Sequence, residues 1–250
     1  MQRMNGKVAL VTGGAGGIGA AICRTLAEHG VSVIVGYHAS ETAARQLAAS
    51  LPGTDQIHAA RAAPVTDSEA LGVLAADIDR IYGRCDILVN CHGATKFVEH
   101  HDLDALDDAL IDTILATNVR GSFATVRAMR ALLERHGNGL VVNISSISAA
   151  LALGSNVMYC ASKAALDNMT RSLARALAPK IRVVSLSPGL VKTDFVNTFD
   201  PAWLERYIAA TPLQRVILPE EIGQAVVAIA TVLPAVTGVI LPVDGGRTLM

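Results

Sequence analysis

Two reactive side chains lie four positions apart in YCASK, residues 159–163. On a helix, positions i and i+4 share one face with Cβ atoms about 5–6 Å apart, so Tyr159 and Lys163 can act on the same small volume. A phenol has a pKa of about 10, and a neighbouring cation lowers it toward the range useful for proton transfer at neutral pH. The pair alone is weak evidence, because such a spacing arises easily by chance.

A glycine-rich stretch, TGGAGGIG at residues 12–19, offers a second kind of chemistry. It follows an apolar, strand-like segment and opens a helix-like one. Glycines such as Gly13, Gly17 and Gly19 let a loop turn tightly, let a pyrophosphate approach the backbone, and point helix-terminal N–H groups at negative charge. A flexible turn would explain the glycines alone, but the strand before and the helix after favour a nucleotide-phosphate site.

The elements that must position these groups alternate along the chain. Nearly continuous apolar runs, typical of strands buried on both faces, lie at residues 7–12, 31–36, 56–60, 86–90, 139–145, 181–187 and 238–243. Helix-period segments lie between them, at residues 17–29, 41–50, 67–82, 103–136, 156–178 and 219–232. This order predicts an α/β, doubly wound (Rossmann-type) sheet of about seven parallel strands with helices on both faces. No linker or repeat divides the chain, so we expect a single domain over residues 1–250.

The least regular segment, residues 192–215, holds the Trp and two of the four Phe residues of the sequence. It follows a strand end, where α/β sheets bind ligands. A lid over a substrate site is one interpretation. A surface helix that packs its aromatic side chains into the core is equally compatible with the sequence.

Composition excludes several classes of function. The formal net charge of −1 and the lack of a Lys/Arg run argue against a nucleic-acid partner. The most apolar stretch, residues 225–242, is broken by Pro234 and Gly238, so we expect no transmembrane segment. A short apolar run at the amino terminus and four cysteines without a C-x-x-C pair predict a cytoplasmic protein with reduced thiols. We expect no metal site.

Taken in order, the motifs resemble those of the short-chain dehydrogenase/reductase family nearly end to end. The matching stretches are TGGAGGIG (12–19), DILVNCHG (86–93), NVRG (118–121), NISS (143–146), YCASK (159–163), SPGLVKT (187–193) and TGVILPVDGG (237–246). Much of the sequence, PLQRVILPEEIG at 212–223 included, is similar to the 3-oxoacyl-[acyl-carrier-protein] reductase branch. That branch name is shared by many enzymes acting on other ketones and alcohols.

The resemblance implies hydride transfer between a nicotinamide cofactor and a carbonyl, with Asn118, Ser146, Tyr159 and Lys163 as the catalytic residues. Tyr159 would give a proton to the substrate oxygen, and Ser146 would hydrogen-bond the same oxygen. Lys163 would lower the pKa of the phenol and hold the nicotinamide ribose. Asn118 would distort its helix locally and hold a water that links the lysine to solvent.

The resemblance also implies the cofactor contacts: Gly13, Gly16, Gly17, Ile18, Gly19, Tyr37, His38, Ser40, Val65, Asn90, Gly93, Tyr159, Lys163, Pro188, Gly189, Val191 and Thr193. An acidic residue at the end of the second strand would favour NAD, but Tyr37 stands there. His38 and Ser40 can offer hydrogen bonds to a 2′-phosphate, so we favour NADP(H), with NAD(H) as the alternative. Gly16 lies where many NADP-using relatives carry an arginine, so that phosphate clamp is missing.

Two departures from the family pattern lie near this predicted cofactor site. Pro64-Val65 replaces the usual Asp-Val, which removes a carboxylate contact to the adenine. The usual Asn-Asn-Ala-Gly becomes Asn90-Cys91-His92-Gly93. The His92 imidazole could donate to the cofactor ribose, or it could crowd the site.

The predicted substrate pocket is apolar, formed by Leu151, Leu153, Val157, Phe195, Phe199, Trp203 and Tyr207, with no Arg or Lys clearly poised for a carboxylate. We therefore expect NADP-dependent reduction of a 3-oxoacyl-like or other apolar ketone to a secondary alcohol. The alternatives are an NAD-dependent alcohol or sugar dehydrogenase working oxidatively, and a non-catalytic cofactor-binding protein.

Partners are predicted by analogy as well. Arg135, Arg171 and Arg175 could meet an acidic acyl carrier protein, or they could be solvated helix-face charges. Relatives pair the helices that match residues 103–136 and 156–178 across twofold axes, which implies a homotetramer.

Overall fold

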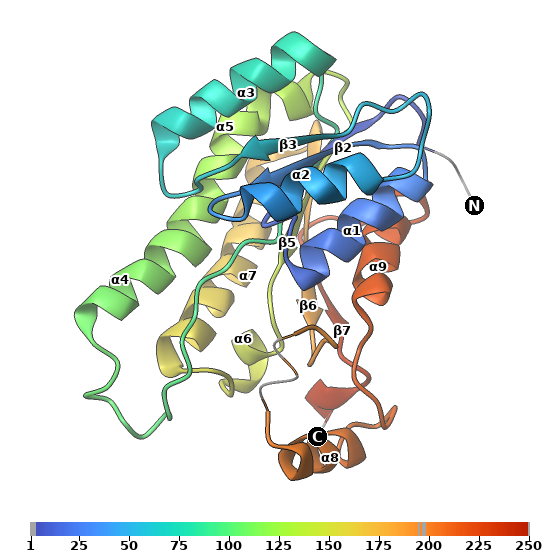
Figure 1. The fold of residues 1–250 in the computed structure, drawn as a ribbon. Helices are drawn as coiled ribbons and strands as arrows, with labels where there is room; N and C mark the ends of the chain where they lie inside the picture. The colour runs from blue at the N-terminus through green and yellow to red at the C-terminus, as the bar shows by residue number, and fades with distance from the viewer. Residues whose placement is uncertain (1–3, 195, 197–198, 250) are drawn as a thin grey trace.

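A parallel sheet of seven strands lies at the centre of the molecule, in the order β3-β2-β1-β4-β5-β6-β7 (Figure 1). The computed structural model describes residues 4–194, 196 and 199–249. The strands are β1 (Val8–Thr12), β2 (Ser32–Tyr37), β3 (Ala59–Ala62), β4 (Ile87–Asn90), β5 (Gly139–Ile144), β6 (Ile181–Pro188) and β7 (Ile240–Val243). Every neighbouring pair is parallel, which confirms the predicted doubly wound fold. The strand order reverses between β1 and β4, and such sheets bind ligands beyond the carboxyl ends of the strands at this switch point.

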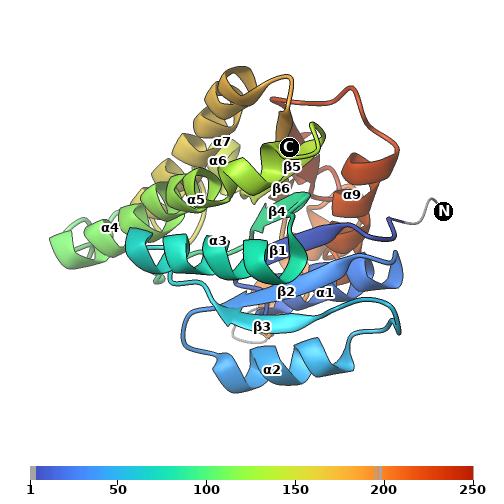
Figure 2. The ribbon, with the colours of Figure 1, turned by 90° about the horizontal axis from the view of Figure 1, so that it is seen from above.

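Helices cover both faces of the sheet (Figure 2). One layer contains α1 (Gly17–Glu28), α2 (Glu41–Ser50) and α9 (Pro219–Thr231), and the other contains α3 (Ser68–Tyr82), α5 (Ser122–Glu134) and α7 (Val157–Leu177). Side chains along β1 alternate between the two cores: Ala9 and Val11 pack with the first layer, and Val8 and Leu10 with the second. Burial on both sides explains why this strand is apolar without alternation.

The predicted helix 103–136 is interrupted in the structure. It contains α4 (Asp108–Leu115), a π-helical turn η1 (Ala116–Gly121) and then α5. Single π-turns inside α-helices are frequent at functional sites. Asn118, one of the predicted catalytic residues, lies in this turn.

Three short elements lie at the carboxyl end of the sheet, and of these only a helix within segment 192–215 was among the expectations from the sequence. They are α6 (Ser148–Leu151), α8 (Pro201–Ala209) and the 3₁₀ turn η3 (Arg247–Leu249). The described carboxyl terminus lies beside α8 (Figure 1). No residue of α8 is buried, so the expectation that a helix in segment 192–215 packs its aromatics into the core is wrong.

Within the part of the chain that the structure describes, no helix is both long and apolar enough to cross a membrane. Over the same residues, no group of three or more His, Cys, Asp or Glu side chains is arranged to hold a metal ion.

Candidate active site

The glycine-rich turn between β1 and α1 forms a backbone cradle at the switch point. Gly13 has a φ of +63°, and a Cβ added there would lie 3.0 Å from the carbonyl oxygen of Cys91. A Cβ at Gly19 would lie 2.2 Å from the carbonyl oxygen of Gly13. These positions therefore require glycine, and the backbone stays open to a ligand.

Helix α1 begins at the same turn. Its N-cap, Gly16, has no side chain to satisfy the first N–H groups of the helix, and Gly16 and Gly17 are exposed. Ile18 packs partly against the core. A Cβ at Gly17 would lie 2.6 Å from Cγ2 of Thr193, so the segment after β6 closes on the turn. Free N–H groups at a helix terminus suit a phosphate, and the cradle fits a dinucleotide pyrophosphate.

The end of β2 presents the predicted cofactor-selecting residues to solvent. Tyr37 is half-buried, and His38 and Ser40 are exposed. The structure adds a carboxylate that the sequence analysis overlooked: hydrogen bonds from Arg45 and, to a lesser extent, Tyr37 lower the pKa of Glu41. Glu41 is therefore ionised at neutral pH beside the predicted 2′-phosphate position.

Val65 and Asn90 lie inside the protein at the predicted adenosine end. Val65 is buried, and a Cβ at Gly121 would lie 2.8 Å from its Cγ2, so Val65 packs against η1. The Asn90 side chain donates to Oδ1 of Asn143 at 2.9 Å and accepts from Thr125 at 2.6 Å. The Asn90 side chain thus joins β4 to β5 and α5.

The His92 ring occupies an interior position between the glycine turn and the π-turn. Its Nδ1 lies 2.7 Å from Oγ1 of Thr12, and its Nε2 lies 3.2 Å from Oγ of Ser122. The Ser122 hydroxyl donates to the Asn118 carbonyl at 2.8 Å, and the Thr12 hydroxyl donates to the Val89 carbonyl at 3.2 Å. The neutral ring carries one N–H, so one of its nitrogens donates and the other accepts, and the tautomer decides which. Both ring nitrogens are used by the protein.

Burial keeps this ring neutral. Desolvation, followed by the positive charge of Lys163, lowers the pKa of His92 to about 3. His92 therefore cannot supply a cation to a cofactor phosphate at neutral pH. It bridges the turn that begins at Thr12 to the one that contains Asn118.

Asn118 joins the segment after β4 to helix α7. Its Oδ1 accepts from Ala94 N–H at 2.7 Å, and its Nδ2 donates to the Ala94 carbonyl and to Ser162 Oγ, both at 3.0 Å. Ser162 in turn donates to the Tyr159 carbonyl at 2.7 Å. A Cβ at Gly93 would lie 3.6 Å from Asn118 Oδ1 and 3.9 Å from Lys163 Nζ.

Tyr159 and Lys163 lie on α7 as their spacing predicted. Nζ of Lys163 lies 5.8 Å from the Tyr159 ring centre and donates to the Ile144 carbonyl at 2.8 Å. Burial lowers the pKa of Lys163 to about 8, although Cys91 and Asp167 oppose the shift. An amine with this pKa can exchange a proton near neutral pH.

The expected depression of the Tyr159 pKa is not what the structure gives. Desolvation raises the pKa of the phenol, and a hydrogen bond with Ser146 opposes the rise. Lys163 is not among the causes of this shift. The phenol alone therefore favours its protonated form, which suits a proton donor.

The two serines after β5 point to different partners. Ser145 is buried and donates weakly to the Lys163 carbonyl at 3.4 Å. Ser146 donates to Ser148 Oγ at 3.0 Å and accepts from Ser148 N–H at 3.1 Å. Ser148, which the sequence analysis did not single out, thus orients Ser146 from the first turn of α6.

The end of β6 completes the crevice. A Cβ at Gly189 would lie 3.0 Å from Cα of Asp244, which packs the turn after Pro188 tightly against β7. Val191 bridges to Ile217. With Thr193 against Gly17, the structure brings the predicted contacts from this segment to the glycine cradle.

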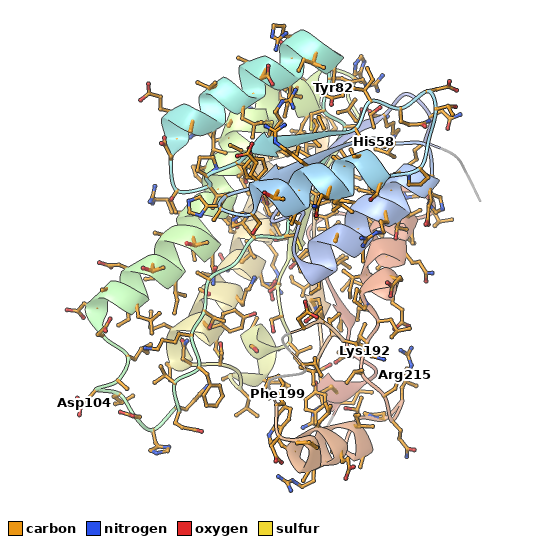
Figure 3. The ribbon with its side chains drawn as sticks, viewed as in Figure 1. His58, Tyr82, Asp104, Lys192, Phe199 and Arg215 are labelled. Atoms are coloured by element: carbon orange, nitrogen blue, oxygen red, sulfur yellow. The ribbon has the colours of Figure 1, made fainter. Side chains whose placement is uncertain are left out.

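Aromatic side chains of the 192–215 segment form a stack along α8. Ring centroids are 4.6 Å apart for Phe199–Trp203 and 5.4 Å apart for Trp203–Tyr207. Phe199 lies at the carboxyl end of the sheet near α8 (Figure 3). Phe195 lies outside the described residues. Leu153 and Val157 are exposed, and so leave apolar surface on the predicted pocket wall.

Two arginines that the sequence analysis overlooked flank this stack. Arg206 and Arg247 line a cavity of about 160 Å³ together with Trp203 and Tyr207. Arg206 could have been found from its i+3 spacing to Trp203 on the surface helix that was one interpretation of segment 192–215. No local sequence pattern marks Arg247, because its position beside α8 depends on the path of the chain after β7.

The arginines predicted to meet a carrier protein differ from one another. Arg135 pairs with Asp79 at 2.5 Å and donates to the Gly83 carbonyl, so it is committed to α3. Arg171 and Arg175 are exposed on α7.

Comparisons with known proteins cover almost the whole chain. The family model described as enoyl-(acyl carrier protein) reductase matches residues 13–248. Galactitol 2-dehydrogenase (L-tagatose-forming) of Cereibacter sphaeroides is 35% identical over 99% of this chain and 97% of its own. The 3-oxoacyl-[acyl-carrier-protein] reductase of Thermotoga maritima is 30% identical over 99% of this chain and 100% of its own. The structure of a Serratia marcescens short-chain dehydrogenase/reductase variant matches with a TM-score of 0.89 and 31% identity, covering 99% of this chain and 100% of the other.

Proposed function

Because the chain belongs to the short-chain dehydrogenase/reductase family, we propose that it reduces the carbonyl of a 3-oxoacyl-like or other apolar ketone to a secondary alcohol, with NADP(H) as the hydride carrier. Its relatives carry dehydrogenase and reductase names, and the chain is an NAD(P)-dependent oxidoreductase. The family and the enzyme class predicted from the motifs are confirmed. The substrate class, the direction of the reaction and the preferred nucleotide are what we propose.

One observation carries this proposal: four polar side chains from three separate segments meet beside the glycine cradle. Asn118 comes from η1, Ser146 from the end of β5, and Tyr159 and Lys163 from α7. A dinucleotide bound in the cradle would supply hydride in reduction. The protein residues then have to hold the carbonyl and deliver a proton to its oxygen.

The phenol of Tyr159 gives its proton to the oxygen that gains negative charge, and Ser146 turns its hydroxyl proton from Ser148 Oγ to the same oxygen. Lys163, with its pKa lowered to about 8, restores the proton to the phenol. Asn118 fixes the position of α7 through Ser162, so that the phenol and the amine keep their spacing.

The substrate class follows from the surface around these groups. Leu153 and Val157, on the predicted pocket wall, expose 67% and 40% of their surface, and the aromatic stack along α8 adds further apolar surface at the carboxyl end of the sheet. Exposed apolar side chains of this kind favour an apolar substrate body. We infer that segment 192–215 acts as a lid over this body, within one dinucleotide-binding and catalytic unit.

NADP(H) is favoured because no acidic residue closes β2 and because His38 and Ser40 are free to bind a 2′-phosphate. Glu41 works in the other direction, since its ionised carboxylate repels a phosphate. It supports a second candidate function, the NAD-dependent oxidation of an alcohol or sugar. The identity with galactitol 2-dehydrogenase supports the same candidate.

The experiment is the initial rate of acetoacetyl thioester reduction with NADPH and with NADH, followed by nicotinamide absorbance. Turnover that prefers NADPH supports the leading proposal. Turnover that prefers NADH keeps the reductase chemistry and overturns the cofactor assignment. No reduction, together with NAD-dependent oxidation of a polyol such as galactitol, favours the second candidate.

We also propose a homotetramer in which α5 and α7 pair with copies of themselves. Phe123 on α5 is 43% exposed, with the Arg127 guanidinium 5.7 Å from its ring centre. Light scattering of the wild type and of Phe123→Glu tests the assembly. A smaller particle for the variant alone supports pairing through α5, and a monomeric wild type contradicts it.

A further inference from the structure

A small cavity beside α8 combines aromatic walls with two positive charges. It has a volume of about 160 Å³ and is lined by Trp203, Arg206, Tyr207 and Arg247. Positions 203, 206 and 207 share one face of α8, because residues three and four apart are neighbours on a helix. Arg247 reaches the cavity from η3, 40 positions later in the chain.

The arginine on the η3 side is held in place before any ligand binds. Its guanidinium lies 4.6 Å from the centre of the Tyr207 ring, at the end of the stack that begins with Phe199. Nη1 of Arg247 donates to the Ala210 carbonyl at 3.0 Å. A cation fixed on an aromatic face loses little conformational entropy on binding, which is the benefit of preorganisation.

The positive charge of the cavity is not neutralised by the described part of the chain. No carboxylate there lies within ion-pair distance of Arg206 or Arg247, whereas Arg45 and Arg215 pair with Glu41 and Glu221. The neighbouring Asp244 carboxylate is occupied by N–H groups of Gly246 and Thr248 and by the Thr248 hydroxyl. Guanidinium groups match the geometry of carboxylates and phosphates.

The cavity is linked to the proposed reaction site through Tyr207. The phenol oxygen of Tyr207 accepts from Leu190 N–H at 3.2 Å, and Leu190 directly follows the Pro188-Gly189 turn at the end of β6. An anion held between the arginines would therefore fix α8 on the strand-end turn. The volume is close to that of an engineered protein cavity of about 150 Å³ that binds benzene, so it suits a phosphate or a carboxylate with one small apolar group.

We propose that Arg206 and Arg247, on the wall formed by Trp203 and Tyr207, form a subsite for an oxyanion carried by the substrate at a distance from its reacting carbonyl. The inference rests on the proposed function, since the oxyanion belongs to the ketone or alcohol that the enzyme converts. Two sources share this chemistry: the phosphate of a phosphopantetheine arm, and a carboxylate on a small ketone. It departs from the sequence-based expectation of a pocket with no Arg or Lys poised for a carboxylate.

The first test measures anion binding in the absence of turnover. The sequence has one Trp, so the fluorescence of Trp203 reports on this cavity directly. We expect 4′-phosphopantetheine to change the emission and pantetheine not to, if the source is phosphate. A response to benzoate and not to benzamide indicates a carboxylate. No response to either anion, with the protein shown to be folded by circular dichroism, overturns the subsite whether or not the enzyme reduces ketones.

Variants then separate charge from structure. Arg206→Gln and Arg247→Gln each weaken binding of the responding anion by about tenfold, the effect of losing one charge-assisted hydrogen-bonding group. Arg24→Gln, at an exposed position of α1, serves as the matched control and leaves binding unchanged. Equal loss in the control, or no loss in either cavity variant, contradicts the proposal.

Steady-state kinetics test whether the subsite binds the substrate that the enzyme converts. Acetoacetyl phosphopantetheine and acetoacetyl pantetheine differ by the phosphate alone. We expect both cavity variants to raise the KM of the phosphorylated thioester about tenfold, with kcat and the constants for the unphosphorylated thioester little changed. A fall in activity on both thioesters alike would assign the arginines to folding of α8 instead. If the wild type reduces neither thioester, the proposed function fails, and the fluorescence result still decides the subsite.

Discussion

The crevice has two ends whose polar groups are satisfied in opposite ways. Around Asn118 the amide uses three hydrogen bonds, and His92, Ser122 and Thr12 form a continuous chain that ends at the Asn118 carbonyl. Within α8 itself no residue is buried, and among the described residues no carboxylate pairs with the two guanidinium groups that line the cavity. The end that carries the proposed chemistry is complete within the protein, while the end that meets the substrate is left open for a ligand.

This difference has a physical reason. Groups that move protons must hold fixed distances in every turnover, and a low-dielectric interior strengthens the hydrogen bonds that fix them. Groups that select a substrate must exchange water for ligand, so their binding capacity has to remain unused in the free protein. Substitutions at the two ends should therefore differ in kind as well as in size.

The largest effect on activity and stability is expected from removing the side chain at the centre of the buried hydrogen-bond network. Asn118→Ala leaves the Ala94 backbone groups and Ser162 without their partner, so we expect a fall in kcat of about 100-fold and a loss of about 3 kcal/mol in the free energy of unfolding. Steady-state kinetics and urea unfolding measure the two effects. Asn138→Ala, at an exposed loop position, is the control and should change neither.

The sequence predicts each end of the crevice only as far as local sequence patterns determine it. The glycine turn and Tyr159-x-x-x-Lys163 were predicted because the turn and the i, i+4 face are local properties. The family resemblance implied a local distortion of the helix at Asn118, but its π-helical form was not predicted, because the helix period continues through 103–136. What places Asn118 is its contact with Ala94, 24 positions away, and that pairing leaves no mark in the local pattern.

The open end was harder to predict. The apolar positions of α8 do recur at helical spacing, at 203, 204, 207 and 208, but the helix is short and lies within an irregular segment, so the pattern left a lid and a surface helix equally open. Arg206 and Arg247 meet only because the chain returns beside α8 after β7. The role of His92 was likewise hidden, since its partners Thr12 and Ser122 lie on two other elements.

The pH dependence of stability sharpens the comparison at His92. Its folded-state pKa of about 3 lies below the usual 6.5, so between these values the unfolded chain binds more protons and acid destabilises the protein. The penalty amounts to about 2 kcal/mol at pH 5 and is absent above pH 6.5.

His92→Gln keeps a donor and an acceptor but cannot titrate. The difference in unfolding free energy between the wild type and this variant should therefore shift by about 2 kcal/mol in favour of the variant between pH 7 and pH 5. Urea unfolding at the two pH values measures it. A difference that does not change with pH would show that the His92 ring is not held neutral in the fold.

The smallest expected effect lies at the exposed end of β2. Glu41→Gln removes the carboxylate whose pKa is lowered by Arg45, so the KM for NADPH should fall a few-fold while the KM for NADH stays the same. Glu28→Gln, which changes an exposed acid at the last residue of α1, is the control. Equal changes for both nucleotides would mean that Glu41 does not face the 2′-position.

The most direct test of the account is the rate of acetoacetyl thioester reduction by Tyr159→Phe, compared with Tyr82→Phe. The Tyr82 hydroxyl, on α3 and well away from the crevice (Figure 3), has no hydrogen-bond partner among the described residues, so its removal should leave the rate unchanged. Loss of the Tyr159 hydroxyl should lower kcat by about 10²–10⁴-fold while NADPH still binds, as nicotinamide fluorescence can measure. A Tyr159→Phe enzyme that keeps the wild-type rate would contradict the assignment of Tyr159 as the proton donor.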